Sequence, residues 1–234
     1  DDRLSRGLGD VYKRQVLIST GSTEKRTLDI PGNDLHGIEQ AMDFLTHNNK
    51  FVDKQINAHL DRYNAKDKNI IVIGGGDTGS DCIGTCNRHG ASSVINFELS
   101  HKPGKNSDSS NPWPYWPFTL KTTSSHQEGV SREWSILTKK FTGDKNNNLI
   151  GIETVNVEID KITGKISEIP NSNKTWKCDM VILALGFTGP EESLPNLLDI
   201  DMDNRGNISS NSDYQTKKNN IFTAGDCRRG QSLI

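Results

Sequence analysis

The chain has 234 residues, and its 28 basic and 30 acidic side chains leave a net charge of −2. The two signs are interspersed, which argues against nucleic acid or an anionic lipid surface as a partner. The apolar runs are far shorter than the roughly 20 residues that span a bilayer, and the start lacks a secretion signal. We therefore expect a cytoplasmic protein of one large or two modest domains, with no membrane segment.

The first part of the chain changes from polar to apolar at residue 16. Residues 1–15 are polar and contain glycine, and we expect them to be disordered or not native to the fold. A strand is predicted at 16–19, and it ends in the small-residue turn Thr20-Gly21-Ser22. This segment is therefore expected to be the first ordered element.

A helix and a linker are predicted next. Apolar residues from Ile38 to Leu45 recur at helical spacing, and Asn48-Asn49 suggests the end of that helix. The stretch 53–68 is polar and charged with few apolar positions, which is typical of a linker between domains. We place a domain boundary between residues 62 and 63.

A strand, a turn, a helix and a second strand follow in the order of a βαβ unit. The strands are predicted at 69–73 and 93–99, and the helix at 78–88, closed by His89-Gly90. Residues 133–141 suit a strand or a short helix. Further strands are predicted at 149–160, 166–169, 180–185 and 220–224, with a hairpin turn at 160–165.

The turn Gly74-Gly75-Gly76-Asp77-Thr78-Gly79 matches the pattern G-x-G-x-x-G between a strand and a helix. In that pattern Gly74 permits the tight turn, Gly76 allows the backbone to approach a pyrophosphate, and Gly79 allows close packing of the helix. The helix N-terminus favours phosphate, and Asp77 or Thr78 could cap it. Glycines also serve ordinary strand-to-helix turns, so the residue at the end of the second strand discriminates between the two interpretations.

Glu98 stands at the end of that second strand, where an acidic residue binds the adenine ribose in dinucleotide sites. A carboxylate there accepts hydrogen bonds from the ribose hydroxyls and repels a 2′-phosphate, which favours NADH over NADPH. No arginine stands beside Glu98 in the sequence, although His101 and Lys102 keep NADPH possible. The alternative is a solvated strand end without a ligand.

The four cysteines are too scattered for a disulfide framework or an iron–sulfur site. Cys82 and Cys86 could share one helix face, but no pair of histidine or acidic ligands accompanies them. Free cysteine commonly behaves as a small buried hydrophobe. We therefore expect no metal site.

Two further strand ends resemble the glycine-ended strand at 16–21. They are Ala184-Leu185-Gly186-Phe187 and Ala224-Gly225-Asp226. Together the three are similar, in order, to the flavoprotein reductases with two dinucleotide-binding domains. In that family a T-G turn and an A-G-D turn belong to the FAD domain, and a strand ending in A-x-G-F returns from the NAD domain.

Four longer segments, 74–85, 94–99, 111–117 and 225–233, resemble the glutamate synthase small (beta) subunit. The resemblance implies that hydride passes from NAD(P)H to FAD. It also implies that electrons pass through iron–sulfur clusters to a large subunit, which makes glutamate from glutamine and 2-oxoglutarate. The family's cysteine-rich N-terminal domain and its first FAD glycine turn are absent, so we expect a fragment.

The resemblance carries cofactor roles to matching positions, and none of these residues is assigned a catalytic role. It implies that Gly225 and Asp226 meet the flavin's ribityl and pyrophosphate region, while Gln231, Ser232 and Leu233 approach the isoalloxazine edge. It implies also that Thr20 and Gly21 line the FAD side of the junction, and that Gly186 and Phe187 lie near the nicotinamide.

The expected fold is α/β, with a Rossmann-like NAD(P)-binding domain at 63–185 inserted in a partial FAD domain formed by 16–62 and 186–234. Two alternatives remain open at this point. One is a related reductase that feeds a different electron acceptor, and the other is a non-catalytic dinucleotide-sensing module. His126 and Glu128 could form an acid–base pair, but hydride transfer to flavin requires orientation more than a protein proton donor.

Overall fold

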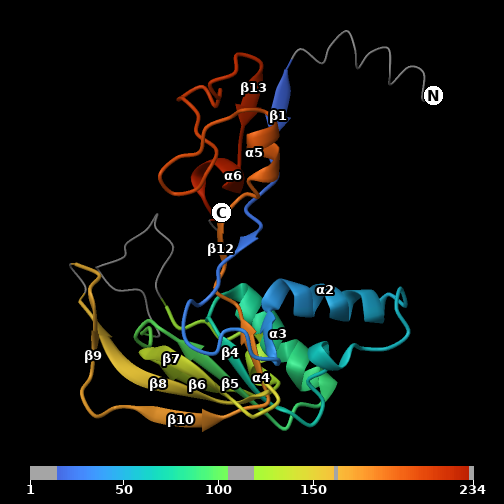
Figure 1. The fold of residues 1–234 in the computed structure, drawn as a ribbon, viewed down its shortest axis with the longest axis vertical. Coiled ribbons are helices and arrows are strands. Elements are labelled where there is room, and N and C mark those ends of the chain that lie inside the picture. The colour runs from blue at the N-terminus through green and yellow to red at the C-terminus, as the bar shows by residue number, and fades with distance from the viewer. Residues whose placement is uncertain (1–14, 105–118, 161–162, 232–234) are drawn as a thin grey trace. The chain divides into compact units, whose positions relative to one another are not determined.

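The computed structural model describes residues 15–104, 119–160 and 163–231 (Figure 1). The chain divides into two compact units, residues 27–185 and the pair of segments 1–26 and 186–234. The first unit is thus inserted in the sequence of the second. The expectations for residues 1–14 and for the Trp-Pro segment 111–117 lie outside the described residues.

A five-stranded parallel sheet forms the centre of residues 27–185, in the order β3-β11-β4-β5-β6. Its middle strands are apolar because both faces are covered, as is usual for parallel sheets. Strand β4, for example, directs Ile70 and Val72 to one face and Ile71 and Ile73 to the other. The strands are β3 (Ile38–Gln40), β4 (Asn69–Ile73), β5 (Ser93–Glu98), β6 (Ser131–Trp134) and β11 (Met180–Leu183).

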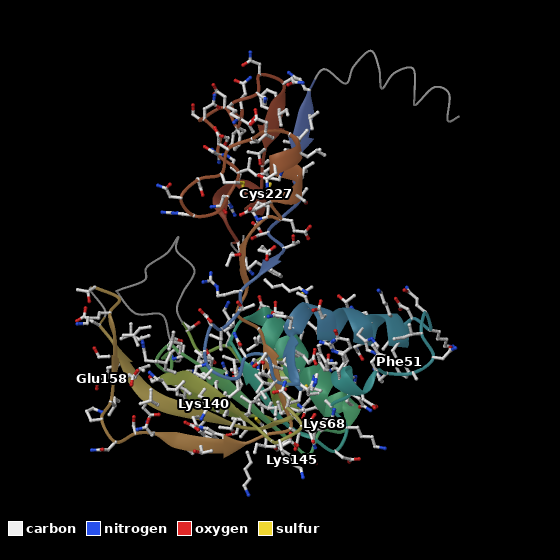
Figure 2. All side chains as sticks on the ribbon, viewed as in Figure 1. Phe51, Lys68, Lys140, Lys145, Glu158 and Cys227 are labelled. Carbon is white, nitrogen blue, oxygen red and sulfur yellow. The ribbon has the colours of Figure 1, made fainter. Side chains whose placement is uncertain are left out.

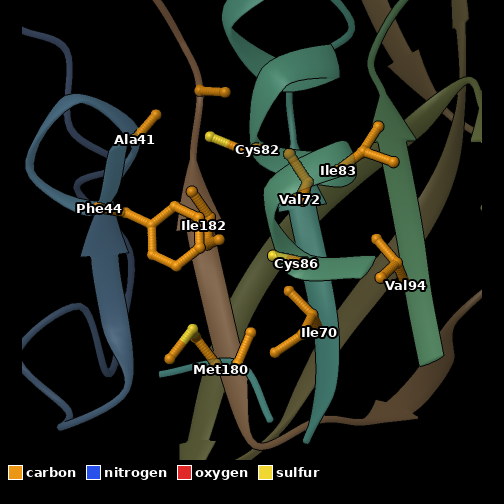
Figure 3. Close-up of a cluster of buried hydrophobic side chains, with 12 residues drawn as sticks. Ala41, Phe44, Ile70, Val72, Cys82, Ile83, Cys86, Val94, Met180 and Ile182 are labelled. Carbon is orange, nitrogen blue, oxygen red and sulfur yellow. The ribbon is translucent and has the colours of Figure 1, made fainter. Parts of the chain in front are cut away.

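Two helices cover one face of this sheet (Figure 1). They are α2 (Ala41–Val52) and α3 (Asp77–His89), and α3 ends at Gly90, whose left-handed conformation suits glycine. Figure 3 shows Phe44 of α2 and Cys82, Ile83 and Cys86 of α3 against strand residues such as Ile182. Two short helices, η1 (Asp61–Tyr63) and α4 (Ser124–Gln127), complete the helical elements of residues 27–185 that the structure describes.

An antiparallel sheet covers the opposite face. Its residues Phe141, Leu149 and Ile152 pack with Ile71 and Val181 of the parallel sheet. The order is β10-β8-β7, with β9 paired to the far part of β8. The strands are β7 (Ile136–Gly143), β8 (Leu149–Ile159), β9 (Ile166–Glu168) and β10 (Lys174–Lys177).

The other unit is built from two small sheets and its own core. Strand β1 (Val16–Ile18) pairs in parallel with β13 (Ile221–Thr223), and β2 (Glu24–Lys25) pairs with β12 (Phe187–Gly189). Two short helices accompany them, α5 (Ser193–Leu197) and α6 (Asp226–Arg229). Cys227, labelled in Figure 2, is fully buried in this core. The other buried members are Ile18, Ile200, Ile208 and Ile221.

Two local expectations differ from the structure, and one alternative is decided by it. Ile38 was expected in the helix but lies in strand β3, because it pairs with Val181 of β11. Of the two possibilities for residues 133–141, strand or short helix, the structure has strand, in β6 and β7 with Ser135 between them. The first boundary was placed between 62 and 63, whereas the compact unit begins at Thr27, because β3 and α2 pack on the sheet and on α3.

The predicted α/β class, with a nucleotide-binding type of parallel sheet inserted in a second unit, is confirmed. In the part of the chain that the structure describes, no helix is both long and apolar enough to cross a membrane. The candidate site residues divide between the two units.

Candidate functional site

The glycine turn connects β4 to α3 at the carboxyl edge of the parallel sheet. Gly74 has a φ of +117°, and a Cβ there would overlap the carbonyl oxygen of Ala184. A Cβ at Gly79 would overlap the carbonyl of Gly74. Gly76, in contrast, has open space where a Cβ would lie. Close packing in the turn therefore requires glycine at positions 74 and 79, whereas Gly76 leaves open space beside the turn.

The N-terminus of α3 faces this open space without a side-chain cap. Gly76 is the N-cap residue and has no side chain to accept the first-turn amides. The suggestion that Asp77 or Thr78 caps the helix was wrong, because both lie inside the first turn. Gly75, Gly76 and Asp77 are exposed. Unpaired amides and the positive end of the helix dipole at an exposed glycine turn fit the phosphates of a dinucleotide.

Glu98 ends β5 directly over the turn. Its carboxyl group occupies the space where a Cβ of Gly75 would lie. Oε1 of Glu98 accepts a 2.7 Å hydrogen bond from Nη2 of Arg132, which lies on β6. An arginine therefore contacts Glu98 in space, although no arginine is near Glu98 in the sequence. The contact arises because β5 and β6 pair in parallel, with Glu98 in register with Trp134.

Asn96 is a second supporting residue that the sequence analysis missed. It is completely buried in β5, and its Nδ2 donates to the carbonyls of Val72 (3.1 Å) and Gly74 (2.9 Å). The amide of Gly74 also donates to the carbonyl of Phe97 at 2.9 Å. The turn is therefore fixed to the neighbouring strand. A polar residue inside an otherwise apolar strand was the signal that pointed to this role.

His126 and Glu128 have different partners. Thr123 and His126 form a capping box at α4, and the Thr123 hydroxyl is 2.5 Å from that of Ser80 on α3. Burial lowers the pKa of His126, and the charge of Arg132 lowers it further. Glu128 pairs with Arg88 at 2.6 Å. These contacts fix α4 on α3, and they leave the two residues without a shared acid–base contact.

In the other unit, one glycine turn follows each strand of the parallel pair β1 and β13 at its carboxyl end. The amide of Ala224 donates to the carbonyl of Ile18 at 3.0 Å, so the pairing of the two segments continues one residue past β13. A Cβ on Gly225 would lie 3.8 Å from the hydroxyl of Ser19, which precedes Thr20 and Gly21. Gly21 and Gly225 both have a φ of +76°. Asp226 begins helix α6 directly after this edge.

Gly186, Phe187 and Gln231 form a second small group in that unit. The amide of Phe187 donates to Oε1 of Gln231 at 3.1 Å, and that same oxygen lies 2.7 Å from the position of a Cβ on Gly186. Three predicted site residues are therefore in contact. Ser232 and Leu233 lie outside the described residues.

Curated relatives match nearly the whole chain. The glutamate synthase [NADH] of Schizosaccharomyces pombe is 45% identical over 230 residues, which are 94% of this chain and 11% of that protein. The glutamate synthase [NADPH] small chain of Mycobacterium tuberculosis is 36% identical over 224 residues, which are 94% of this chain and 45% of that protein. The chain thus spans less than half the length of these relatives.

Solved structures have the same fold. FprA of Mycobacterium tuberculosis, in a complex with NADPH, matches with a TM-score of 0.67 and 15% identity over 97% of this chain and 61% of that one. The thioredoxin reductase of T. acidophilum matches with a TM-score of 0.58 and 19% identity over 93% of this chain and 58% of that one. At this identity the likeness shows the fold alone.

A model of the family described as pyridine nucleotide-disulphide oxidoreductase matches residues 9–234. The match includes the glycine turn, Glu98 and both strand ends of the second unit. The chain therefore belongs to the pyridine nucleotide-disulphide oxidoreductase family.

Proposed function

We propose that this chain is the NAD(P)H-binding part, with a portion of the FAD-binding part, of a glutamate synthase small subunit. It binds NADH or NADPH so that hydride passes from the nicotinamide to FAD, and so supplies electrons for making glutamate from glutamine and 2-oxoglutarate. The relatives that carry the glutamate synthase name support this reading, since they match along 94% of the chain. The observation that carries the proposal is the open glycine turn beneath the Glu98 carboxylate.

In the proposed nucleotide site, residues of this chain bind the dinucleotide and orient it. The open space at Gly76 admits a pyrophosphate, which the first-turn amides of α3 receive by hydrogen bonds. Gly75, Asp77 and Thr78 surround this approach. Glu98 accepts hydrogen bonds from the adenosine ribose, and this contact favours NADH. Rate enhancement then comes from orientation, because hydride transfer needs no protein acid.

In the proposed flavin site, the exposed edge after β1 and β13 holds the cofactor. Thr20, Gly21 and Gly225 offer backbone groups there, and Asp226 accepts a hydroxyl hydrogen bond. Gly186, Phe187 and Gln231 form the nicotinamide-facing and isoalloxazine-facing group, which Ser232 and Leu233 extend. When bound, FAD supplies the two-electron acceptor chemistry that amino-acid side chains lack.

The remaining parts of the reaction belong, in our proposal, to other polypeptide. Iron–sulfur clusters would belong to a cysteine-rich domain outside this chain, and glutamate formation to a large glutamate synthase subunit that is the protein partner. The proposed location is the cytoplasm. No nucleic acid or membrane takes part in this scheme.

The test uses the native gene product that contains these 234 residues. NADH-dependent formation of glutamate from glutamine and 2-oxoglutarate is measured together with reduction of an artificial dye. Both activities are expected, and Gly76→Val should abolish both, because its side chain fills the open space at the turn. Dye reduction without any glutamate formation, in the presence of the large subunit, would contradict the assignment to glutamate synthase.

A further inference from the structure

Glu98 and Arg132 form an ion pair at the carboxyl edge of the parallel sheet, called here the Glu98–Arg132 pair. Among the ion pairs between described residues, it is the one in which both side chains are largely enclosed. The two side chains are only 12% and 13% exposed. They come from neighbouring strands, β5 and β6, and the described structure joins them at 2.7 Å. A pair at this depth requires good geometry to offset its desolvation.

Arg132 has a fixed position and an unused donor. Its Nη1 donates to the carbonyl of Lys121 at 2.8 Å, and its guanidinium lies over the ring of Trp134, 5.0 Å from the centroid. Its Nε is buried and has no hydrogen-bond partner among the described residues. Arginine matches phosphate oxygens with a planar fork of donors, so this side chain has the chemistry of a phosphate ligand.

The pair also fixes the carboxylate. Oε1 of Glu98 is occupied by Arg132, while Oε2 lies against the backbone of Gly75 in the glycine turn. One oxygen thus fixes the orientation, and the other remains directed at the turn. A free glutamate at a strand end would instead distribute among several rotamers and lose this directionality.

We propose that Arg132 is a positioning residue for the nucleotide: it fixes Glu98 for a free ribose 2′-hydroxyl, and Glu98 in turn withholds Arg132 from a 2′-phosphate. The inference deepens the proposed function and rests on it. The pair then sets the choice between NADH and NADPH, because each side chain limits the contacts of the other. Removing Arg132 should weaken the contact of Glu98 with the ribose, and removing the charge of Glu98 should leave Arg132 able to bind a 2′-phosphate.

A second cation strengthens the latent phosphate site. Lys102 lies over the same Trp134 ring, 4.7 Å from its centroid, so the indole has cations from two chain segments near it. When glutamine replaces Glu98, Arg132 and Lys102 can both face a phosphate dianion. When Glu98 is present, its negative charge repels that dianion and pairs with Arg132.

The experiment measures dissociation constants by calorimetry for ADP-ribose and 2′-phospho-ADP-ribose on the native gene product that contains these 234 residues. The variants are Glu98→Gln, Arg132→Gln and the double variant, which form a double-mutant cycle. Arg88→Gln is the matched control, because Arg88 forms a 2.6 Å ion pair with Glu128 at the other end of α3. Thermal unfolding of each variant checks folding, and Arg132→Lys replaces Arg132→Gln if the latter does not fold.

We expect Arg132→Gln to weaken the binding of ADP-ribose about tenfold when Glu98 is present. In the Glu98→Gln background the same substitution should weaken this binding less than about twofold. We expect Glu98→Gln to tighten 2′-phospho-ADP-ribose about tenfold, and the double variant to lose that gain. Arg88→Gln should change neither constant.

Equal effects of Arg132→Gln in both backgrounds would overturn the inference while leaving the nucleotide site intact, since they would show that Arg132 does not act through Glu98. No gain of the 2′-phosphate probe in Glu98→Gln would overturn it as well. Failure of both probes to bind the unaltered chain would instead refute the proposed nucleotide site, and this inference with it.

Discussion

The two edges of the parallel sheet hold different kinds of titratable group. At the carboxyl edge, Glu98 and Arg132 form an ion pair beside an open glycine turn. At the amino edge, the rings of His47 on α2, His59 between α2 and η1, and His89 at the end of α3 lie together. The ring centroids are 5.5 Å apart for His47 and His59, and 4.5 Å apart for His59 and His89. One edge pairs opposite charges, whereas at the other edge burial lowers the pKa of His59 and of His89.

The histidine cluster at the amino edge contributes to packing. Burial lowers the pKa of His89 to about 4, and the neighbouring His59, Arg88 and His47 add to this effect. Nε2 of His89 also lies 2.9 Å from Oδ1 of Asn48, and Nδ1 of His89 accepts a hydrogen bond from the backbone amide of Ala65. Among the described residues, no group of three or more ligand side chains is arranged to hold a metal ion. Clustered histidines therefore pack at a helix end, while the carboxylate paired with Arg132 lies at the candidate site.

The largest expected effect on stability is at Gly74. Gly74→Ala should lower the free energy of unfolding by about 3 kcal/mol, since the residue has a positive φ and the new Cβ would overlap the Ala184 carbonyl. Gly164→Ala is the matched control, because Gly164 also has a positive φ but open space around it. It should cost about 1 kcal/mol. Urea unfolding measures both, and equal losses would show that close packing at the turn contributes nothing.

The amino edge should respond to pH. The folded pKa of His89 is about 4, below its ordinary value of 6.5, so the unfolded chain binds the proton more readily. Stability is therefore complete above pH 6.5 and declines as the pH falls toward 4, by about 2 kcal/mol for this partly buried group. His89→Gln should remove this part of the pH dependence. The exposed His101→Gln is the control, and an unchanged slope in His89→Gln would contradict the interpretation.

Asn96 should contribute less, because it acts through two neutral hydrogen bonds. Asn96→Ala removes the donors to Val72 and Gly74 and leaves a small cavity, so it should cost about 1 to 2 kcal/mol. Chemical denaturation measures this loss. The comparison is Asn87→Ala on α3, because half-buried Asn87 donates a single side-chain hydrogen bond, to the carbonyl of Gly129 at 2.8 Å. A loss no greater than that of Asn87→Ala would show that the glycine turn stands without support from β5.

The smallest effect is expected at an exposed ion pair. Arg88 is 58% exposed where it meets Glu128, so Arg88→Gln should cost less than about 0.5 kcal/mol. Raising the salt concentration should remove the difference between this variant and the unaltered chain. A loss above about 1 kcal/mol at high salt would show that exposure does not separate this pair from the Glu98–Arg132 pair.

The glycine turn was predictable because its causes are local. Gly74, Gly76 and Gly79 follow an apolar strand directly, and Gly90 ends the next helix by a left-handed conformation. The strand 69–73 and the helix from Asp77 follow from the same short-range chemistry. Local sequence was therefore sufficient for the element that carries the nucleotide proposal.

The rest depended on contacts between distant segments. Arg132 reaches Glu98 only because β6 pairs in parallel with β5, and no local pattern specifies that pairing. Ile38 precedes a helix and shares its apolar spacing, yet pairing with β11 makes it a strand residue. The same pairing moves the domain boundary from residue 62 to residue 26. Tertiary pairing, which single-sequence periodicity does not encode, decided each of these.

The most direct test of the central claim is the dissociation constant of NADH for Gly76→Val, measured by calorimetry beside the unaltered chain. We expect NADH to bind at least about a hundredfold more weakly to a chain that still folds, because the new side chain enters open space at the glycine turn without meeting a neighbour. Gly164→Asn, also in open space, should bind NADH normally. Undiminished NADH binding by a folded Gly76→Val chain would show that the glycine turn does not hold the nucleotide.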